Sequence, residues 1–321
     1  MKVAIVPGDG IGREVVPVAE GVLRLLHPDW DYYPVEVGYG RWERCGAAIG
    51  SEEMRALSEA DAILFGAVTT PPDPDYRSVL LQIRHDLDLY ANVRPVRGPG
   101  VDITIVRENT EGLYSGIEWN LPGSACTLRV VTERGSWRIA RFAAGLVRGG
   151  RLTIGTKANV IKSDVLFRRC AIEEAEAAGV AWEEKYIDAL CLDVLMHPAR
   201  YGVIVTTNIF GDILSDAAGY LVGGLGMLPS ANIGDKYAFF EPVHGSAPDI
   251  AGRGIANPVA AIRSAALLLA HFGHADEAAA VDAAVDAVLA AGVRTPDLGG
   301  ASSTVQVGEA VLGRITVPRL C

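Results

Sequence analysis

The segment GVIVTTNIFGDILSD, residues 202–216, carries the most informative pattern in the chain. Its first part is apolar and β-branched, as in a buried strand, and its second part opens a helix that we expect over residues 212–221. Asp212 and Asp216 would share one face of that helix and would repel each other unless a cation lay between them. The spacing therefore indicates Mg²⁺ or Mn²⁺, which prefer oxygen ligands, although two solvated acids near a helix N-terminus would give the same spacing.

The composition excludes several classes of protein. The chain has 321 residues, 50% of them hydrophobic, which is enough for a large core and two lobes. A net charge of -10 argues against a nucleic-acid surface, and five cysteines without C-x-x-C spacing argue against a zinc site or a disulfide framework. The chain starts with a strand-like run rather than a signal peptide, and the apolar run Ala260–Ala270 is too short for a membrane span. We therefore expect a cytoplasmic protein without a membrane or nucleic-acid partner.

Strand-like and helix-like segments alternate along the chain, which predicts an α/β fold. The expected strands are Val3–Val6, Ala62–Phe65, Ile103–Val106, Leu152–Ile154, Val203–Thr206 and Ala238–Phe240. The expected helices are Arg13–Leu26, Glu52–Ser58, Trp137–Val147, Asp164–Ala178, Asp212–Leu221, Pro258–His271 and Glu277–Ala290. The Pro- and Gly-rich stretch Arg97–Gly100 is expected to cross between two lobes.

The glycines of Gly8–Gly12 lie at the end of a strand and precede a helix, as in a Rossmann phosphate loop. The G-x-G-x-x-G fingerprint fails, however, because Arg13 occupies the third glycine position. The pattern therefore favours a tight strand-to-helix turn that needs positive φ angles.

Three arginines, Arg84, Arg94 and Arg107, fall in a short stretch of the chain. Arginine has a planar fork that binds carboxylates in a bidentate manner, so three of them suit a dicarboxylate substrate. Arg107 directly follows an apolar strand, which favours a side chain that points into a cleft over ordinary surface ion pairing.

Three further residues near strand ends have side chains suited to catalysis or metal binding. Tyr114 and Lys157 would relay protons if cationic neighbours or burial lowered their pKa values. The alternatives are a core tyrosine with a satisfied hydroxyl and a solvated lysine. Asp188, expected at a strand end, is a candidate third metal oxygen, and its alternative role is that of a helix N-cap.

A second glycine-rich loop, His244–Gly252, precedes Asn257 and a proline suited to a first helical turn. Such a loop would let a nucleotide approach the backbone. Asp249 would accept hydrogen bonds from both hydroxyls of an adenosine ribose and would repel a 2′-phosphate. A plain connecting loop would have the same glycine content.

Together these segments resemble the β-decarboxylating dehydrogenases of isocitrate, homoisocitrate, 3-isopropylmalate and D-malate or tartrate, essentially from end to end. The resemblance implies a two-lobed, non-Rossmann α/β fold of the isocitrate/isopropylmalate dehydrogenase type, with the active site in the interlobe cleft. It implies a large nucleotide-binding lobe, residues 1–96 plus 228–321, and a small lobe, residues 97–227, with the dimer interface and the metal site. It also implies a homodimer whose active sites are shared across the interface.

The resemblance implies a role for each matching residue. Arg84, Arg94 and Arg107 resemble the clamps for the substrate carboxylates, and Tyr114 resembles the acid that protonates the enol. Lys157 resembles the general base, donated across the interface. Asp212 and Asp216 resemble the metal ligands of one subunit, with Asp188 reaching in from the other, and the metal would be Mg²⁺ or Mn²⁺. The residues that resemble the adenosine-binding loop, and that favour NAD over NADP, are His244, Gly245, Ser246, Ala247, Asp249, Ile250 and Asn257.

The segment that would face the variable C3 group of the substrate gives conflicting signals. Leu80 and Leu81 form an apolar wall, as in isopropylmalate enzymes, whereas Ser78 resembles a serine that contacts a distal carboxylate and Arg77 adds a cation. We expect an acidic C3 substituent, with homoisocitrate ahead of isocitrate. 3-Isopropylmalate, D-malate or tartrate, and a phosphonate-bearing malate analogue remain alternatives. The alternative of a different class is a non-catalytic regulatory subunit, which the intact set of candidate catalytic residues disfavours.

Overall fold

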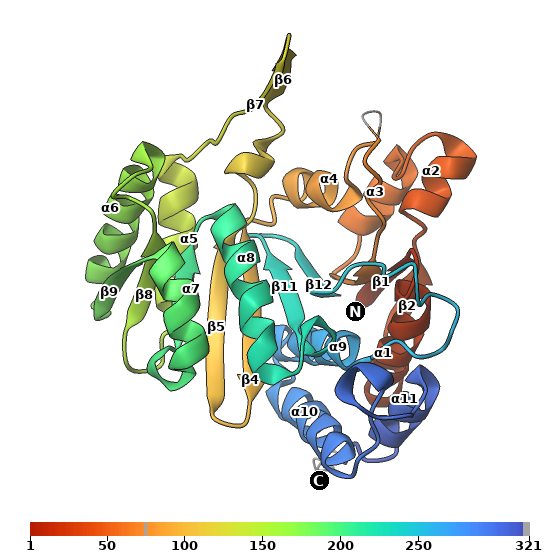
Figure 1. The fold of residues 1–321 in the computed structure, drawn as a ribbon. Coiled ribbons are helices and arrows are strands. Elements are labelled where there is room, and N and C mark those ends of the chain that lie inside the picture. The colour runs from red at the N-terminus through yellow and green to blue at the C-terminus, as the bar shows by residue number, and fades with distance from the viewer. Residues whose placement is uncertain (74–75, 317–321) are drawn as a thin grey trace. The chain divides into compact units, whose positions relative to one another are not determined.

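The computed structural model describes residues 1–73 and 76–316 of the chain (Figure 1). The chain divides into two compact units. Unit 1 contains residues 1–83, 225–231 and those from 236 onward, and unit 2 contains residues 84–224 and 232–235. The division into lobes that the sequence suggested, with the interlobe position of the site, stays a prediction.

Unit 1 combines mostly parallel strands with four helices, each of which contacts two of the others. The strands follow the order β2 (Asp31–Pro34), β1 (Lys2–Gly8), β3 (Ala62–Ala67), β12 (Ala238–Pro242) and β11 (Pro229–Ile233). The four helices are α1 (Gly12–Leu26), α9 (Val259–His271), α10 (Ala275–Ala290) and α11 (Thr304–Leu312). Shorter helices are α2 (Tyr39–Cys45), α3 (Ser51–Ser58) and α4 (Val79–Asp86), and the last three residues of α4 belong to unit 2. Every residue of β3 is buried, as its continuous apolar run AILFGA requires.

Unit 2 has a strand order of β4 (Ala91–Gly98), β5 (Val101–Glu108), β10 (Val203–Thr206), β8 (Leu152–Thr156) and β9 (Trp182–Tyr186). β4 and β5 are antiparallel, and the other neighbours in this order are parallel. Helices α5 (Glu133–Leu146) and α6 (Lys162–Ala177) contact each other, as do α7 (Ile187–Met196) and α8 (Asn208–Gly219). The hairpin of β6 (Glu118–Leu121) and β7 (Ser124–Thr127) projects from this unit (Figure 1).

The α/β prediction is confirmed, and all expected strands and helices are present with shifted bounds. The most informative shift is in α8, which begins at Asn208 rather than at Asp212 because extended Thr207 is its N-cap. The expected lobe crossover at Arg97–Gly100 is wrong. Gly98 pairs with Val101, so the stretch is the tight turn of the β4–β5 hairpin, with Gly100 at φ 75°. Proline and glycine mark a turn as readily as a linker, so their presence alone did not decide between the two.

The turn at Gly8–Gly12 has the conformation that the sequence indicates. Gly8 and Gly10 have φ angles of 70° and 54°. A Cβ atom at Gly10 would come within 2.0 Å of the Ser246 carbonyl oxygen, which also accepts a hydrogen bond from the Ile11 amide at 2.9 Å. The glycines therefore let the β1–α1 turn lie directly against the second glycine-rich loop.

Within residues 1–73 and 76–316, no helix is long and apolar enough to cross a membrane. Cys45, Cys126, Cys170 and Cys191 are free, and Cys321 lies outside the described residues. The prediction of a chain without a disulfide framework agrees with these four thiols.

Candidate active site

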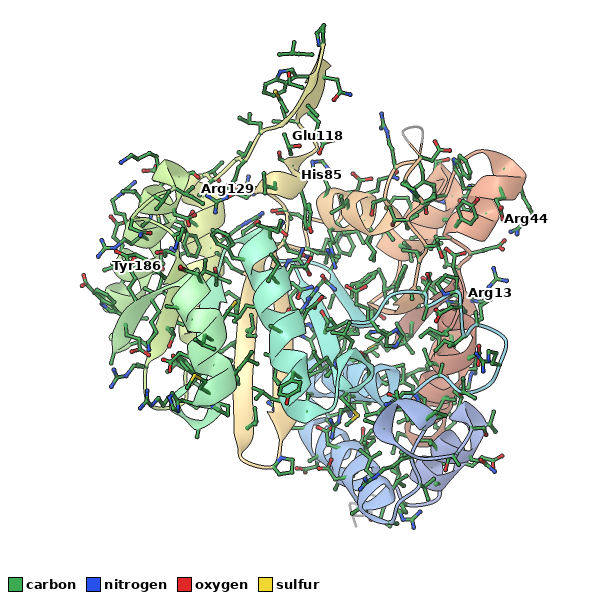
Figure 2. The ribbon with its side chains drawn as sticks, viewed as in Figure 1. Arg13, Arg44, His85, Glu118, Arg129 and Tyr186 are labelled. Atoms are coloured by element: carbon green, nitrogen blue, oxygen red, sulfur yellow. The ribbon has the colours of Figure 1, made fainter. Side chains whose placement is uncertain are left out.

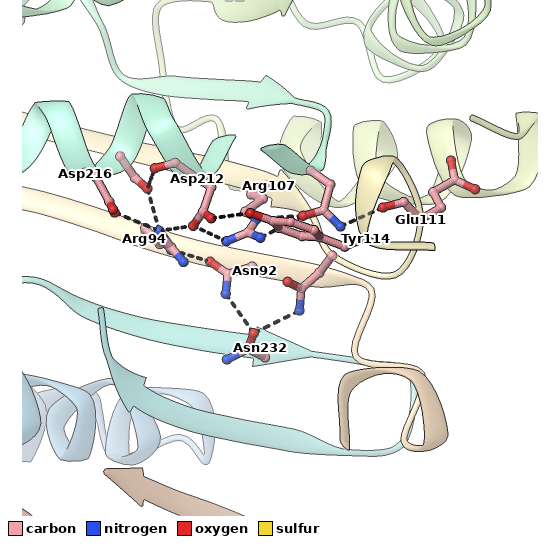
Figure 3. Close-up of polar contacts among 11 residues, drawn as sticks. Asn92, Arg94, Arg107, Glu111, Tyr114, Asp212, Asp216 and Asn232 are labelled. Carbon is pink, nitrogen blue, oxygen red and sulfur yellow. Dashed lines mark hydrogen bonds and ion pairs between the residues drawn. The ribbon is translucent and has the colours of Figure 1, made fainter. Parts of the chain in front are cut away.

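A cluster of buried arginines and aspartates lies within unit 2, where β4 and β5 meet α8 (Figure 3). Arg84, Arg94 and Arg107 are 6%, 5% and 1% exposed. Arg107 and Asp212 are 105 residues apart in sequence, yet the guanidinium Nη1 donates a hydrogen bond to the carboxylate Oδ1. The cationic residues and the acid pair that the sequence singled out separately are therefore parts of one cluster.

Arg107 is held by the first turn of α8. Its Nε and Nη2 atoms donate hydrogen bonds to Asn208 Oδ1 at 3.1 and 2.7 Å, while the Asn208 amide donates to the Glu111 carbonyl at 2.7 Å. Gly211 permits this approach, because a Cβ atom there would lie 2.6 Å from the Arg107 Cβ. The NIFGD sequence thus positions one arginine fork beside the helix that carries both aspartates.

Arg94 contacts both aspartates of α8. Its Nη1 atom lies 3.0 Å from Asp212 Oδ1 and 3.2 Å from Asp216 Oδ1, and it donates to Ser215 Oγ at 2.7 Å. Its Nε atom donates to Asn92 Oδ1 at 2.9 Å. The two arginines supply the positive charge that lets the two carboxylates stay close together.

Asparagines that sequence reasoning missed support this cluster from below (Figure 3). Asn92 and Asn109 each donate an amide hydrogen to Asn232 Oδ1, at 2.7 and 2.9 Å, and all three side chains are buried. Each asparagine is unremarkable in sequence, although Asn92 lies two residues before Arg94. Buried amides of this kind fix the orientation of a guanidinium because their donors and acceptors must be satisfied.

The two aspartates have opposite pKa shifts. Burial raises the pKa of Asp212, but the charges of Arg107, Arg94 and Arg84 outweigh it, so the net pKa is lowered. Burial, together with the neighbouring charge of Asp212, raises the pKa of Asp216 despite Arg94. Burial and the charges of Arg94 and Arg84 lower the pKa of Arg107, an effect that Asp212 opposes. A strongly perturbed set of interacting charges is typical of a functional site.

Tyr114 lies at the edge of the cluster and is 37% exposed. Its hydroxyl donates to Asp212 Oδ2 at 3.2 Å, and the Arg107 guanidinium carbon lies 5.6 Å from the centre of its ring. The condition set for a relay tyrosine was a lowered pKa, and the pKa of Tyr114 is raised instead. Burial and the Asp212 charge raise the pKa of Tyr114, and Arg107 opposes them only in part. The hydroxyl is therefore protonated at neutral pH, which suits a proton donor.

Lys157 and Asp188 form a second group in unit 2. The Lys157 Nζ atom lies 2.6 Å from Asp188 Oδ1, and this hydrogen bond is the main cause of the lowered pKa of Asp188. Asp188 was expected at a strand end, but it lies in the first turn of α7, directly after β9, with Tyr186 as the N-cap. Among the described residues, no contact given for the Lys157 or Asp188 side chain reaches Arg94, Arg107, Asp212 or Asp216.

A buried carboxylate that sequence reasoning did not assign a role connects Lys157 to α8. Asp164, which is fully buried, accepts a hydrogen bond from the Lys157 backbone amide at 2.6 Å and one from Arg129 Nη2 at 2.5 Å. Arg129, labelled in Figure 2, also donates to Thr207 Oγ1 at 3.0 Å. Asp164 and Arg129 thus link the loop of the candidate base to the N-cap of the aspartate helix.

The chemistry of the α8 acid pair fits a divalent metal. Asp212 and Asp216 offer only carboxylate oxygens, and both already share a single positive group, Arg94 Nη1. Oxygen donors of this kind suit Mg²⁺ or Mn²⁺.

The second glycine-rich loop, in unit 1, fits a nucleotide. His244 Nδ1 lies 3.0 Å from the Gly245 carbonyl, so this nitrogen carries the hydrogen and Nε2 is left as an acceptor. Nε2 is buried and has no hydrogen-bond partner among the described residues, while burial lowers the pKa of His244 and keeps the ring neutral. Ala247 has a positive φ of 38°, and the Gly252 and Gly254 amides donate to Glu14 at 2.6 and 2.9 Å. The backbone of the loop is thus held by hydrogen bonds, while His244 Nε2 remains available to accept one.

The other predicted residues of this loop differ in exposure. Ser246 is 7% exposed and its hydroxyl lies 2.7 Å from Thr69 Oγ1. Asn257 is buried and donates to Asp297 Oδ2 at 2.9 Å, whereas Asp249 is exposed. Gly245 is exposed and Ile250 is partly exposed.

The candidate C3-group residues lie at the start of α4. Arg77 is exposed, Ser78 directly precedes the helix, and Leu80 and Leu81 occupy its first turn with partly exposed side chains. The apolar pair and the polar pair are thus both at least partly accessible, so the choice between them stays a prediction.

The chain matches the family model described as isocitrate/isopropylmalate dehydrogenase over residues 2–311. It therefore belongs to this family of decarboxylating dehydrogenases, for which dependence on NAD and a divalent metal is typical. Relatives include the 3-isopropylmalate/3-methylmalate dehydrogenase of Methanocaldococcus jannaschii, 44% identical with 98% of both chains covered. The isocitrate/homoisocitrate dehydrogenase of Thermus thermophilus is also 44% identical, with 97% of both chains covered.

Solved structures agree with this assignment. An isocitrate dehydrogenase from Methylococcus capsulatus has a TM-score of 0.92 at 39% identity, covering 98% of this chain and 99% of its own. A β-decarboxylating dehydrogenase from Thermococcus kodakarensis has a TM-score of 0.88 at 44% identity, with coverages of 98% and 96%. The relatives carry names for different substrates at equal identity, so similarity alone does not choose among those substrates.

Proposed function

We propose that this enzyme catalyses the NAD-dependent, divalent-metal-dependent oxidative decarboxylation of a 3-substituted (R)-malate whose C3 substituent is acidic, of the homoisocitrate or isocitrate type. The observation that carries the proposal is the cluster of three buried arginines around Asp212 and Asp216. Each guanidinium group has a planar fork that binds a carboxylate, so three of them suit a substrate with several carboxylates.

The residues of unit 2 have distinct tasks in this proposal. Arg84, Arg94 and Arg107 bind the substrate carboxylates and hold the C2–C3 bond in place. Lys157 takes the proton of the C2 hydroxyl, and Tyr114, protonated at neutral pH, gives a proton to C3 after CO₂ is lost. Asp212 and Asp216, with Asp188 from a second subunit, would hold Mg²⁺ or Mn²⁺, which would act there as a Lewis acid on the substrate oxygens.

The loop of unit 1 would hold NAD, which accepts the hydride from C2. The free acceptor His244 Nε2 suits a donor group of the nucleotide, and exposed Asp249 suits the two ribose hydroxyls. An aspartate at this position repels a 2′-phosphate, so we infer NAD rather than NADP.

The test compares NADH formation with homoisocitrate, isocitrate, 3-isopropylmalate and D-malate, in the presence of Mg²⁺ and with NADP as the alternative acceptor. The highest kcat/KM with homoisocitrate or isocitrate supports the proposal. The highest value with 3-isopropylmalate would show that Leu80 and Leu81 decide the C3 pocket. Turnover of none of them, with intact NAD binding, would favour a non-catalytic subunit or an unusual C3 group such as a phosphonate.

A matched pair of variants separates the polar from the apolar reading of this segment. Ser78→Ala should lower kcat/KM for an acidic substrate by about tenfold, as loss of one hydrogen bond to a charged group does. Leu80→Ala should leave that value nearly unchanged. The reverse pattern would contradict an acidic C3 substituent.

A further inference from the structure

Two histidines and a glutamate form a cluster in unit 1, outside the glycine-rich loop of that unit. His27 Nε2 lies 2.6 Å from Glu277 Oε2, and His274 Nδ1 lies 3.2 Å from the same oxygen. One ligand atom from each residue lies within 4.8 Å of the others. In the described part of the chain, these three residues form a group of histidines, cysteines or acids whose ligand atoms lie close enough together to hold one metal ion.

We propose that His27, His274 and Glu277 form a binding site for Zn²⁺ or a similar borderline divalent cation. Two imidazoles and one carboxylate are a common zinc ligand set, with water in the fourth position. A cation at about 2.0–2.1 Å from each ligand atom would lie between the carboxylate oxygen and the two ring nitrogens, in place of their present direct contacts. Small movements of the Glu277 carboxylate suffice to open the 2.6 Å contact for it.

The backbone holds these ligands in place without a metal. His27 ends α1, where its amide donates to the Leu23 carbonyl at 2.7 Å and its carbonyl accepts from the Tyr32 hydroxyl at 3.0 Å. Trp30 stacks on the His27 ring, with centroids 3.9 Å apart and planes at 10°. A stacked and hydrogen-bonded ligand loses little freedom when it binds a cation.

The other two ligands are fixed by the start of α10. His274 is its N-cap, with its amide bonded to the Leu269 carbonyl at 2.9 Å, and Glu277 lies in the first turn. The side chains of His27, Glu277 and His274 are 12%, 21% and 34% exposed. The cluster is therefore protected yet open to solvent on the His274 side, and a bound cation would link the end of α1 to the start of α10.

The ligand chemistry separates this site from the aspartates of α8. Asp212 and Asp216 supply only oxygen and favour Mg²⁺ or Mn²⁺, whereas nitrogen ligands favour zinc. An excess of Mg²⁺ should thus occupy the aspartates and leave the histidine site free. The cation linked to α1 and α10 has no role in hydride transfer and acts on the stability of unit 1.

The experiment is a calorimetric titration of Zn²⁺ into the full chain, stripped of metal and kept in excess Mg²⁺. We expect one Zn²⁺ per chain for the wild type and for Asp212→Asn. His274→Asn and His27→Gln should each weaken binding by at least about 100-fold, because even residues behind a metal ligand contribute about 10–100-fold. Exposed His197, changed to Asn, is the matched control and should leave Zn²⁺ binding unchanged.

Thermal unfolding and Co²⁺ absorption test the same assignment of ligands independently. Zn²⁺ should raise the Tm of the wild type and of His197→Asn, but not that of His274→Asn, because only binding to the folded state stabilises it. Co²⁺ absorption should report nitrogen and oxygen ligands without thiolate bands, which excludes exposed Cys45 as the binder. Equal Zn²⁺ affinity in the wild type and in both cluster variants, or no Zn²⁺ binding by the wild type, would overturn the proposal.

Discussion

Asp212 is the residue on which the contacts of the candidate site converge. Its carboxylate meets Arg94, Arg107 and Tyr114, and the arginine charges hold its pKa low despite burial. Such a carboxylate remains charged throughout the physiological pH range. It is therefore available to a cation, and it would yield its arginine contacts to the substrate carboxylates.

The first prediction concerns this carboxylate. Asp212→Asn should lower kcat/KM by at least about 100-fold, because a preorganised charge at the reacting centre is worth about that much. The affinity for Mn²⁺, measured by electron paramagnetic resonance, should fall as well. The Tm should change by no more than a few degrees, since Asn208 keeps its bonds to Arg107. Exposed Asp102, changed to Asn, is the control, and near-normal turnover of Asp212→Asn would refute the metal assignment.

The second prediction uses the late position of Tyr114 in the reaction. Tyr114→Phe should lower the steady-state kcat by about 100-fold or more, as loss of a general acid does. The first turnover should still produce NADH rapidly, because hydride transfer precedes protonation of C3. Stopped-flow absorbance should therefore show a burst equal to the enzyme concentration. A slow first turnover would assign Tyr114 to an earlier step, and Tyr237→Phe serves as a control outside the cluster.

At the residue scale, the sequence predicted the charged groups but not their supports. Arg94, Arg107 and Asp212 stood out in the sequence because of the chemistry of their side chains, and the structure places Arg94 within β4 and Arg107 within β5. Asn92 and Asn232 were not, since an asparagine has no local signal and their hydrogen bond spans 140 residues. Asp164 was seen only as the start of a helix, because burial of a carboxylate depends on Arg129, which is 35 residues away.

At the element scale, the loop after β8 and the N-terminus of α8 are connected through Asp164. The carboxylate fixes the Lys157 amide, and its partner Arg129 reaches Thr207, the N-cap of α8. Asp164 does not touch the substrate in the proposed reaction. It is a positioning residue in that reaction, because it holds the loop that carries Lys157.

The third prediction tests this positioning role by a double-mutant cycle. Asp164→Asn should lower kcat by about tenfold while leaving the KM for NAD unchanged. In a Lys157→Met background, Asp164→Asn should cause little further loss, because both changes disable the same group. Equal losses in the two backgrounds would mean that Asp164 only supports the fold.

The fourth prediction concerns the packing of α7 against β9. Hydrogen bonds from Lys185 and Tyr201, each 2.5 Å long, lower the pKa of Asp193 to about 2. A lowered carboxyl pKa stabilises the fold above the unfolded pKa and ceases to do so as the pH falls through the folded one. Asp193→Asn should therefore lower the Tm at neutral pH, and its difference from the wild type should shrink between about pH 4 and about pH 2. A Tm difference that is constant with pH would contradict this role.

Elements with strong apolar runs were predictable, and those without them were not. β10 is the buried run VIVT, whereas β9 is WEEKY, a strand at the end of the order in unit 2 with no buried residue. Asp188 was expected at a strand end, but β9 stops at Tyr186 and α7 begins at the next residue, so Asp188 lies in the helix. Charged edge strands depend on pairing with a neighbour, which local periodicity does not record.

At the scale of the whole molecule, two helices of unit 2 present apolar side chains to solvent. Leu192 and Met196 on α7 are both 61% exposed, and Ile213 on α8 is 56% exposed. The projecting hairpin adds Trp119 and Leu121 at 47% and 55% exposure. An exposed apolar face of this kind is typical of a subunit interface. It supports the proposed homodimer, with the face on the same helices that carry Asp188 and Asp212.

The last prediction tests whether active sites are shared between subunits. Lys157→Met and Asp212→Asn should each be inactive alone. If Lys157 of one subunit serves the aspartates of the other, a mixed dimer has one site with both residues intact and one with neither. Unfolding and refolding an equal mixture gives about half mixed dimers, so activity should return to about a quarter of the wild-type value. Lys157→Met unfolded and refolded alone is the control, and it should regain no activity. If each site is instead built from one chain, every site in the mixture carries one defect, and the mixture stays as inactive as its components.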